Sequence, residues 1–296
     1  MTGFGLFAPA GFATDPTAID RAVARLTALG HEVVVDPTAR GRVQRFSAED
    51  DERLAAIARM AADPRVDVAV SVRGGYGWSR LLDRVDYAAL AQARKRWMGH
   101  SDFTAFALAA LAQAGIVTYA GPMAAYDFGA LSPSAYTLAQ CFGVLDHDRW
   151  DVDCALDGPA RLDVEGTLWG GNLALVAHLA GTRFMPDIAG GVLFLEDVAE
   201  HPYRIERMLY QLHHAGVLER QRAVLLGAFT EYAVNPNDGG YDLDGAITHL
   251  RARVRTPICT GLPFGHVPDK LTLPVGGRCR VELRDGAARL SLSDYR

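Results

Sequence analysis

The chain has 296 residues, of which 49% are hydrophobic and 22% are charged, and its formal net charge is -5. That length allows two domains with separate cores, and the composition is typical of a globular protein. The mild negative charge, without any Lys/Arg-rich run, argues against a nucleic-acid-binding protein. No segment resembles a signal peptide or is apolar enough to span a bilayer, so we expect a cytoplasmic protein without membrane partners.

The cysteines are widely separated and show neither CxxC spacing nor the Cys/His spacing of a zinc site. A disulfide framework and a metal centre are therefore not expected, nor is any other cofactor. We expect reduced thiols at Cys141, Cys154, Cys259 and Cys279.

Short apolar segments alternate with segments of helical pattern through the first half of the chain. Ser47 followed by Asp50 approximates the capping box of one helix, and glycines follow the last turns of two others. Strands separated by helices in this way predict an α/β protein with a parallel sheet. The expected strands are 3–8, 31–35, 67–72, 97–98 and 116–119, and the expected helices are 14–30, 47–62 and 104–115.

The alternation ends at residues 144–160, where aspartates, a glycine and a proline crowd together. We interpret this stretch as a linker, with a first domain at 1–145, the linker at 146–160 and a smaller mixed domain at 161–296. Asp285-Gly286 predicts a hairpin turn near the end of the second domain. Its expected strands are 162–169, 192–195 and 223–229, and its expected helices are 172–179, 203–215 and 243–254.

Ser101 lies between a predicted strand and a predicted helix, in the segment Gly-His-Ser-Asp at 99–102. A hydroxyl at such a turn is held beyond the edge of the sheet, in front of the first N–H groups of the helix. The ordinary role of this serine is to cap the helix, and the alternative is a nucleophile. Phe103 stands where the G-x-S-x-G motif requires glycine, which argues against an α/β-hydrolase.

A second segment, Arg-Gly-Gly-Tyr-Gly at 73–77, follows the preceding strand and belongs to the same edge of the sheet. It lacks G-x-G-x-x-G spacing and a phosphate-binding lysine. Its glycines can bring backbone N–H groups close to a ligand, as in half of an oxyanion hole, or can simply form a tight turn.

A serine nucleophile needs a base and a group that orients the base. His266 lies in a loop rich in glycine and proline, 261–268, and Glu196 follows the predicted strand 192–195. The alternatives are a solvated loop histidine and a glutamate that caps the next helix. The other histidines in predicted helices and strands are expected to be surface or packing residues.

Together these segments resemble the LD-carboxypeptidase family of serine peptidases, the muramoyltetrapeptide carboxypeptidases. The likeness spans both domains in the order of the family. The segments that carry it are 73–77, 99–102, 121–122, 170–173, 195–197, 202–209 and 265–266.

The resemblance implies a Rossmann- or flavodoxin-like parallel sheet domain, followed by a smaller mixed α/β domain of the swivelling type. It implies a metal-free triad of Ser101, Glu196 and His266, with the amides of Gly75 and Asp102 as the oxyanion hole. His100 is a departure, because an aromatic such as tyrosine is more usual there. We expect His100 to face away from the nucleophile.

The function that the resemblance implies is hydrolysis of the L,D-peptide bond that releases terminal D-alanine from murein tetrapeptides, in peptidoglycan recycling, by a homodimer. Arg73 and Arg204 are candidates to bind the substrate carboxylate, or else they form ion pairs within the fold. The alternatives are a microcin C-type self-immunity peptidase of the same family and a nonenzymatic α/β protein that binds a small ligand such as a nucleotide or a sugar.

Overall fold

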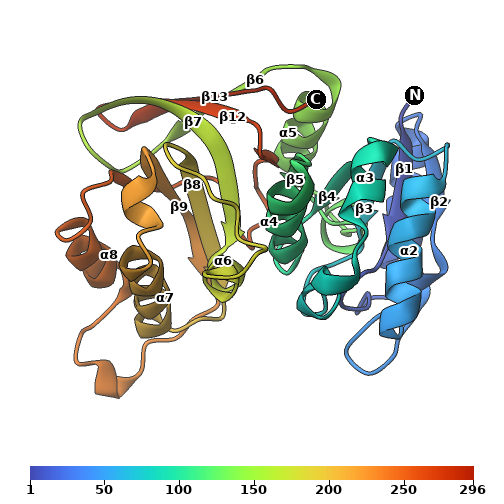
Figure 1. Ribbon diagram of the computed structural model, residues 1–296, viewed down its shortest axis with the longest axis horizontal. Coiled ribbons are helices and arrows are strands. Elements are labelled where there is room, and N and C mark those ends of the chain that lie inside the picture. Colours follow the sequence, from blue (N-terminus) through green and yellow to red (C-terminus); the bar gives the residue numbers. More distant parts are fainter.

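The computed structural model describes residues 1–296 and contains two mixed sheets (Figure 1). Helices α4 and α5 lie between the two sheets in this view. The first sheet has strand order β11-β5-β4-β3-β1-β2, and the second has the order β10-β9-β8-β7-β12-β13-β6. The expected α/β class, with a first sheet domain and a second mixed part, is confirmed.

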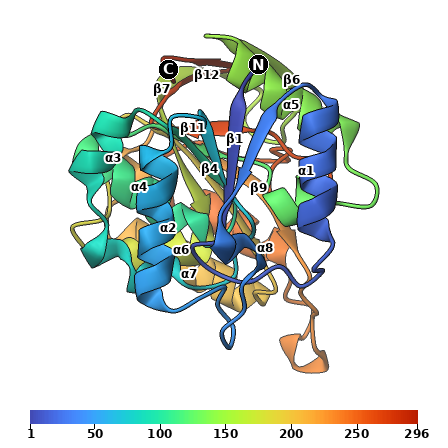
Figure 2. The ribbon, with the colours of Figure 1, turned by 90° about the vertical axis from the view of Figure 1, so that its right-hand side faces the viewer.

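The first sheet contains five parallel strands whose core members are fully buried, which is why their sequences are almost continuously apolar. Helices cover both faces, with α2, α3 and α4 on one side of the strands and α1 and α5 on the other (Figure 2). The strands are β1 (Gly3–Phe7), β2 (Glu32–Val35), β3 (Val68–Ser71), β4 (Arg96–Gly99) and β5 (Thr118–Ala120). The helices are α1 (Ala18–Ala28), α2 (Asp50–Ala62), α3 (Tyr87–Ala93), α4 (Phe103–Ala114) and α5 (Ala135–Asp146).

The second sheet combines a parallel part with an antiparallel part. Its parallel strands are β7 (Arg161–Asn172), β8 (Val192–Val198), β9 (Ala223–Thr230) and β10 (Ile258–Thr260). Its antiparallel strands are β6 (Trp150–Ala155), β12 (Arg278–Arg284) and β13 (Ala287–Ser293). Its helices are α6 (Leu173–Leu179), α7 (Pro202–His214) and α8 (Leu243–Arg251).

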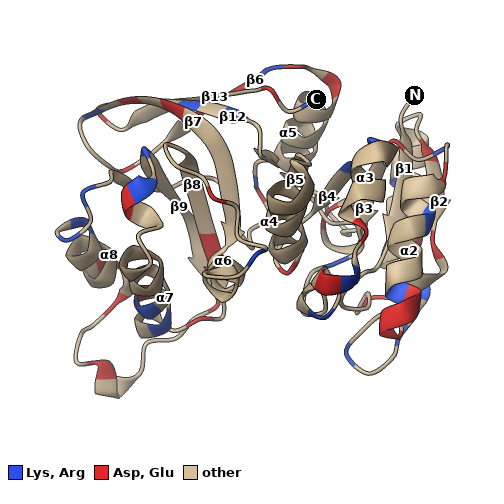
Figure 3. Ribbon diagram, in the orientation of Figure 1, with Lys and Arg blue, Asp and Glu red and all other residues tan.

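The antiparallel strands keep one face in the core and expose the other, on which ion pairs link neighbouring strands. Figure 3 marks basic and acidic residues along these strands. Arg280 on β12 pairs with Asp163 on β7 at 2.9 Å, and Arg289 on β13 pairs with Asp153 on β6 at 2.7 Å. Exposed pairs of this kind contribute little stability individually, at most about 1 kcal/mol. Their opposite charges favour this register over a shifted one.

Two features differ from the expected division of the chain. Within the expected linker, residues 150–155 form strand β6 and pair with β13, because the apolar side chain of Val152 is needed in the core of the second sheet. The first sheet is completed from the other end of the chain, by β11 (Leu273–Val275), which pairs antiparallel with β5. The first sheet is therefore mixed rather than wholly parallel.

Some helix ends also differ from those expected: α1 is shorter than 14–30, and α8 is shorter than 243–254. The predicted capping box at Ser47 is wrong: Glu49 stands at the N-cap of α2, and no side chain caps that end. The Ser47 hydroxyl instead donates a hydrogen bond to the carbonyl of Ala8. The turn at 285–286 is as predicted, since Asp285 and Gly286 have φ of +48° and +87°.

The end of β7 packs closely against α4, which joins the two parts of the molecule. The hydroxyl of Thr104 accepts a hydrogen bond from the amide of Asn172 at 2.9 Å. Gly171 precedes Asn172 and has φ +136°. A Cβ added to Gly171 would lie 2.3 Å from Thr104 Oγ1. Only glycine satisfies both the backbone conformation and this close approach.

We predict that Gly171→Ala destabilises the protein by about 2–4 kcal/mol, because backbone strain and steric overlap add at this position. Gly181→Ala is the matched control, since Gly181 has φ +81° but nothing within 4 Å of an added Cβ. Urea unfolding of both variants measures the difference. Equal losses of stability would show that the contact with Thr104 does not restrict residue 171.

Candidate active site

Ser101 occupies the turn between β4 and α4 with a left-handed backbone, φ +64°. A non-glycine residue in this region costs about 1–2 kcal/mol, so the surrounding structure must hold it there. Gly99 supports the turn, because the ring of Phe103 lies over it, 2.5 Å from where a Cβ would be. Phe103, the residue that rules out the G-x-S-x-G motif, thus closes the base of the turn.

The glycine-rich loop after β3 lies directly against this turn. A Cβ on Gly74 would approach Ser101 Cβ to 2.6 Å and the amide nitrogen of Asp102 to 3.1 Å. Gly75 follows with φ +98°. Neither the Gly75 amide nor the Asp102 amide donates a hydrogen bond within the chain. Both N–H groups therefore retain their capacity to bind an acceptor near Ser101.

The side chain of Asp102 fixes the loop to the turn. It is 1% exposed, and its Oδ2 accepts a hydrogen bond from the amide of Trp78 at 3.0 Å. Burial raises the pKa of Asp102 above its ordinary value. Asp102 is thus a structural anchor as well as a source of a backbone N–H.

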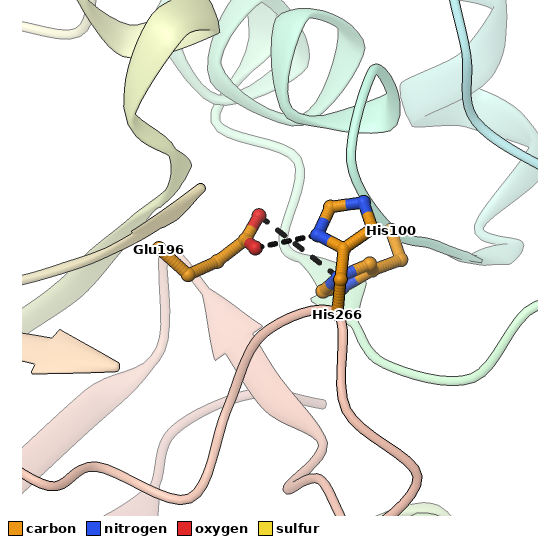
Figure 4. Close-up of side chains that lie close together, drawn as sticks. All are labelled: His100, Glu196 and His266. Atoms are coloured by element: carbon orange, nitrogen blue, oxygen red, sulfur yellow. Dashed lines mark hydrogen bonds and ion pairs between the residues drawn. The ribbon is translucent and has the colours of Figure 1, made fainter. Parts of the chain in front are cut away.

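Glu196 and His266 form a hydrogen bond of 2.7 Å between Oε2 and Nδ1 (Figure 4). Glu196 lies in β8, where the pairing with β9 shifts between Leu195 and Asp197, and such an irregularity changes the direction of a side chain. It has no exposed surface. Its other oxygen, Oε1, accepts a hydrogen bond of 3.3 Å from the side-chain amide Nδ2 of Asn172. Glu196 is therefore not a cap of the following helix.

The loop that carries His266 is attached to both sheets. The Phe264 carbonyl accepts a hydrogen bond from the amide of Ala228 on β9 at 2.8 Å. Lys270 pairs at 2.5 Å with Asp127, in the short π-helical segment η4 (Ala124–Phe128). Both partners of this ion pair are nearly buried. His266 is held between them and is not a freely solvated loop residue.

His100 lies against the pair of Glu196 and His266, a contact that the sequence does not predict. Its side chain is 1% exposed and its Nε2 lies 3.9 Å from Glu196 Oε1. Its ring centroid is 4.7 Å from that of His266, in an edge-to-face arrangement. Because β4 ends at Gly99, the alternation of a strand does not extend to His100, and the left-handed turn sets its direction instead.

A cavity of about 390 Å³ opens beside these side chains. His100 and His266 form one part of its wall, and Lys270 and Asp127 form another. Its remaining lining is mostly polar or small. These residues are Met123, Tyr126, Ala130, Ser132, Pro133, Ser134, Glu231, Val267 and Pro268.

The two arginine candidates lie outside this lining. Arg73 donates a hydrogen bond to the Phe12 carbonyl at 3.2 Å and stacks over the ring of Tyr126 at 5.6 Å. Arg204 is half exposed and pairs with Glu200 at 3.6 Å, the ion pair within the fold that was its alternative role. Through Tyr126, Arg73 lies one side chain from the cavity.

Two further residues of the site, Asn172 and Thr104, are not assigned a role from the sequence. Asn172 holds the carboxylates of both Glu196 and Asp197, with Nδ2 2.8 Å from Asp197 Oδ1. Thr104 holds the Asn172 backbone. The signal available for Asn172 is its place as the N-cap of α6 after two glycines, which predicts a cap but not a contact with Glu196.

This arrangement has the parts that hydroxyl-mediated acyl transfer requires. It combines a hydroxyl in a strained turn, two unbonded N–H groups beside it, and an imidazole oriented by a buried carboxylate. Such a set can remove a proton from an alcohol and stabilise an oxyanion.

We predict that Ser101→Gly is more stable than Ser101→Ala by about 1 kcal/mol, because glycine removes the left-handed strain. In an ordinary helix the sign is opposite, and Ala105→Gly in α4 serves as that control, with an expected loss of about 1 kcal/mol. Thermal or urea unfolding of the three variants measures it. An Ala variant as stable as the Gly variant would contradict a strained turn at Ser101.

Asp197 provides a pH-dependent prediction. Burial raises its pKa to about 6, so it stabilises the fold most below about pH 4, and this contribution is lost as the pH rises through 6. Asp197→Asn should therefore cost about 2 kcal/mol more at pH 4 than at pH 7.5. The free energies of unfolding of wild type and variant measure this. The same change at exposed Asp244 should show no such difference, and a pH-independent cost at Asp197 would contradict the prediction.

Comparison with known proteins accounts for both parts of the chain. Residues 4–121 match the model of the LD-carboxypeptidase N-terminal domain, and residues 165–281 match the model of the C-terminal domain. A probable murein peptide carboxypeptidase of Bacillus subtilis is 29% identical, covering 96% of this chain and 90% of that protein. The murein tetrapeptide carboxypeptidase of Pseudomonas aeruginosa is also 29% identical, with coverage of 94% and 92%.

Solved structures of related proteins have the same fold as this chain. The muramoyltetrapeptide carboxypeptidase of Oxalobacter formigenes superposes with a TM-score of 0.94 at 44% identity, and the match covers 99% of each chain. A microcin self-immunity protein has the same fold, with a TM-score of 0.90 at 22% identity over 99% of this chain and 96% of that chain. The family models together span most of the sequence, and the chain belongs to the LD-carboxypeptidase family, whose members are serine-type hydrolases.

Proposed function

We propose that the protein is a serine carboxypeptidase that hydrolyses the L,D-peptide bond of murein tetrapeptides and releases terminal D-alanine. The observation that carries this proposal is the 2.7 Å hydrogen bond between Glu196 and His266, whose ring packs 4.7 Å from that of His100, the residue that precedes Ser101. The 44% identical muramoyltetrapeptide carboxypeptidase and the murein-specific relatives support the substrate class.

In this proposal His266 accepts the proton of the Ser101 hydroxyl as its oxygen attacks the carbonyl carbon of the scissile bond. Glu196 holds the Nδ1 proton of His266, which leaves Nε2 as the base, and stabilises the imidazolium that forms. His266 then gives its proton to the amine of the leaving D-alanine. Water attacks the acyl-enzyme in the second half of the reaction, again with His266 as base.

The oxyanion is received by the amides of Gly75 and Asp102, which have no acceptor within the chain. Removing one such donor typically costs about 10²–10³ in rate. The N-terminus of α4, which begins at Phe103, adds a favourable dipole at the same place. The left-handed turn at Ser101 is consistent with this role, since strained backbone concentrates at active sites.

The cavity beside His266 fits the part of the peptide nearest the scissile bond. Arg73 is the better of the two arginine candidates for a substrate carboxylate, because it contacts Tyr126 in the cavity wall. Arg204 is already paired with Glu200.

A homodimer acting in cytoplasmic recycling of peptidoglycan remains part of the proposal. None of the helices combines the length and apolar character needed to cross a bilayer.

A self-immunity peptidase is the second candidate within the family. The solved microcin self-immunity proteins share the fold at 21–22% identity, which supports no substrate assignment. A nonenzymatic binding protein would leave the Glu196–His266 pair and the two unbonded amides near Ser101 without a common purpose. We therefore favour the murein peptide substrate.

The test is mass spectrometry of muropeptide tri-, tetra- and pentapeptides after incubation with the protein. We predict loss of one D-alanine from the tetrapeptide, and a fall of about 10⁴-fold or more in Ser101→Ala because the nucleophile is gone. Ser291→Ala on β13, away from the site, is the matched control and should retain wild-type activity. Hydrolysis by Ser101→Ala near the wild-type rate would overturn the nucleophile. Cleavage of a microcin-type acylated nucleotide alone would overturn the substrate class.

A further inference from the structure

His100 is a buried polar side chain that the proposed reaction does not use. It is 2% exposed, and neither of its ring nitrogens has a hydrogen-bond partner. Leaving a buried polar group unpaired costs about 1–3 kcal/mol. Its ring lines the cavity of about 390 Å³ next to His266. A ligand that occupies a ring nitrogen of His100 would recover that cost.

His100 is close to two other groups that can donate electron pairs. One ligand atom each from His100, Glu196 and His266 lies within 4.8 Å of the others (Figure 4). His100 Nε2 lies 3.9 Å from Glu196 Oε1. The first sheet supplies one member of this set, and the second sheet and its loop supply the other two.

Two imidazoles and one carboxylate form a donor set that suits Zn²⁺. Zinc holds such ligands at about 2.0–2.2 Å in a tetrahedron, so their atoms lie about 3.4 Å apart. Distances between ligand atoms of up to 4.8 Å would have to shorten by at most about 1.4 Å, and the 2.7 Å between Glu196 Oε2 and His266 Nδ1 would have to lengthen. The cavity provides access for the ion and for a water molecule as the fourth ligand.

The charges near His100, Glu196 and His266 favour binding of a cation. Glu196 is a carboxylate with no lysine or arginine partner. Lys270 is the nearby positive charge, and its ion pair with Asp127 offsets it.

We propose that His100, Glu196 and His266 form a Zn²⁺ site that reversibly inhibits the enzyme. A metal on His266 Nδ1 displaces the proton that this nitrogen shares with Glu196. The proton moves through solvent to Nε2, and the ring remains neutral. Nε2 then carries hydrogen and cannot accept the Ser101 proton. Binding of the metal needs only the three side chains, whereas the inhibition rests on the proposed function.

The first experiment measures binding to the wild-type protein after removal of metals by chelation. Co²⁺ titration should produce the visible absorption of four-coordinate cobalt, with one ion bound per chain, and Zn²⁺ should displace it. X-ray absorption of the zinc-loaded protein should detect two imidazole ligands. These measurements do not depend on any variant or on activity. Failure of both to detect a bound ion would overturn the site.

The second experiment measures inhibition of D-alanine release by Zn²⁺, with Mg²⁺ as the control ion. His100→Phe keeps the ring packing on Phe264, whose centroid is 5.0 Å away, but removes both nitrogens. Substitution of a residue that only hydrogen-bonds to a metal ligand alters metal affinity by about 10- to 100-fold. Loss of a ligand itself should therefore raise the half-inhibiting Zn²⁺ concentration by about 100-fold or more. Each variant is compared with its own metal-free activity. His178→Phe, on the exposed side of α6, should keep wild-type sensitivity.

The outcomes separate the two proposals. If the protein releases no D-alanine but binds one Co²⁺ through His100, the metal site stands and the proposed function falls. If it releases D-alanine and His100→Phe is as sensitive to Zn²⁺ as wild type, the metal site falls alone. Activation by Zn²⁺ would overturn the inhibitory role.

Discussion

Glu196 is a carboxylate without exposed surface, and the geometry of the site depends on how its two oxygens are satisfied. Oε2 accepts a hydrogen bond from His266, and Oε1 accepts one from Asn172. Burying an unpaired carboxylate would cost several kcal/mol, so these partners must be in place when the protein folds. The backbone N–H of Asn172 in turn donates a hydrogen bond to the hydroxyl of Thr104, on the helix that follows Ser101. The orientation of the imidazole is thus coupled to the contact between the two sheets.

The close contacts around the Ser101 turn and α4 require glycine at two positions, Gly74 and Gly171. Gly74 allows the loop after β3 to approach the Ser101 turn, and Gly171 allows β7 to approach α4. Each removes a side chain where two backbones from different segments meet. The close approaches occur at the carboxyl ends of strands, where α/β proteins place their sites. Small residues therefore allow the loop after β3 and the end of β7 to reach the turn at Ser101 and the helix that follows it.

Much of the fold could be predicted from the sequence, because the buried parallel strands are apolar runs and α1, α2 and α4 have recognisable helical patterns, whereas α3 and α5 were not predicted. The turn at Ser101 and the loop at 73–77 could be assigned to one sheet edge by the same reasoning. The contact of Glu196 with His266 could be expected only from the family resemblance, because 70 residues separate them. The direction of His100 could not be predicted, since it depends on a left-handed turn rather than on strand alternation.

Strand β6, inside the expected linker at 146–160, and the completion of the first sheet could not be predicted, for a related reason. Strand β6 alternates apolar residues with Asp151 and Asp153, and these aspartates favour a linker when the sequence is taken alone. The strand is identified by its partner β13, which lies at the far end of the chain. The same holds for β11, a three-residue strand that sequence periodicity cannot detect. Pairings of this kind depend on long-range register, which local patterns do not contain.

The placement of β11 has a consequence for synthesis on the ribosome. Strand β5 ends at Ala120, but its antiparallel partner begins only at Leu273. While the intervening chain is being made, the β5 edge of the nascent first sheet lacks this partner, and unpaired edges invite pairing with other chains. The two sheets therefore cannot mature one after the other. Only when the last segments emerge can the first sheet close, so a truncated chain would carry an open edge in the half that contains Ser101.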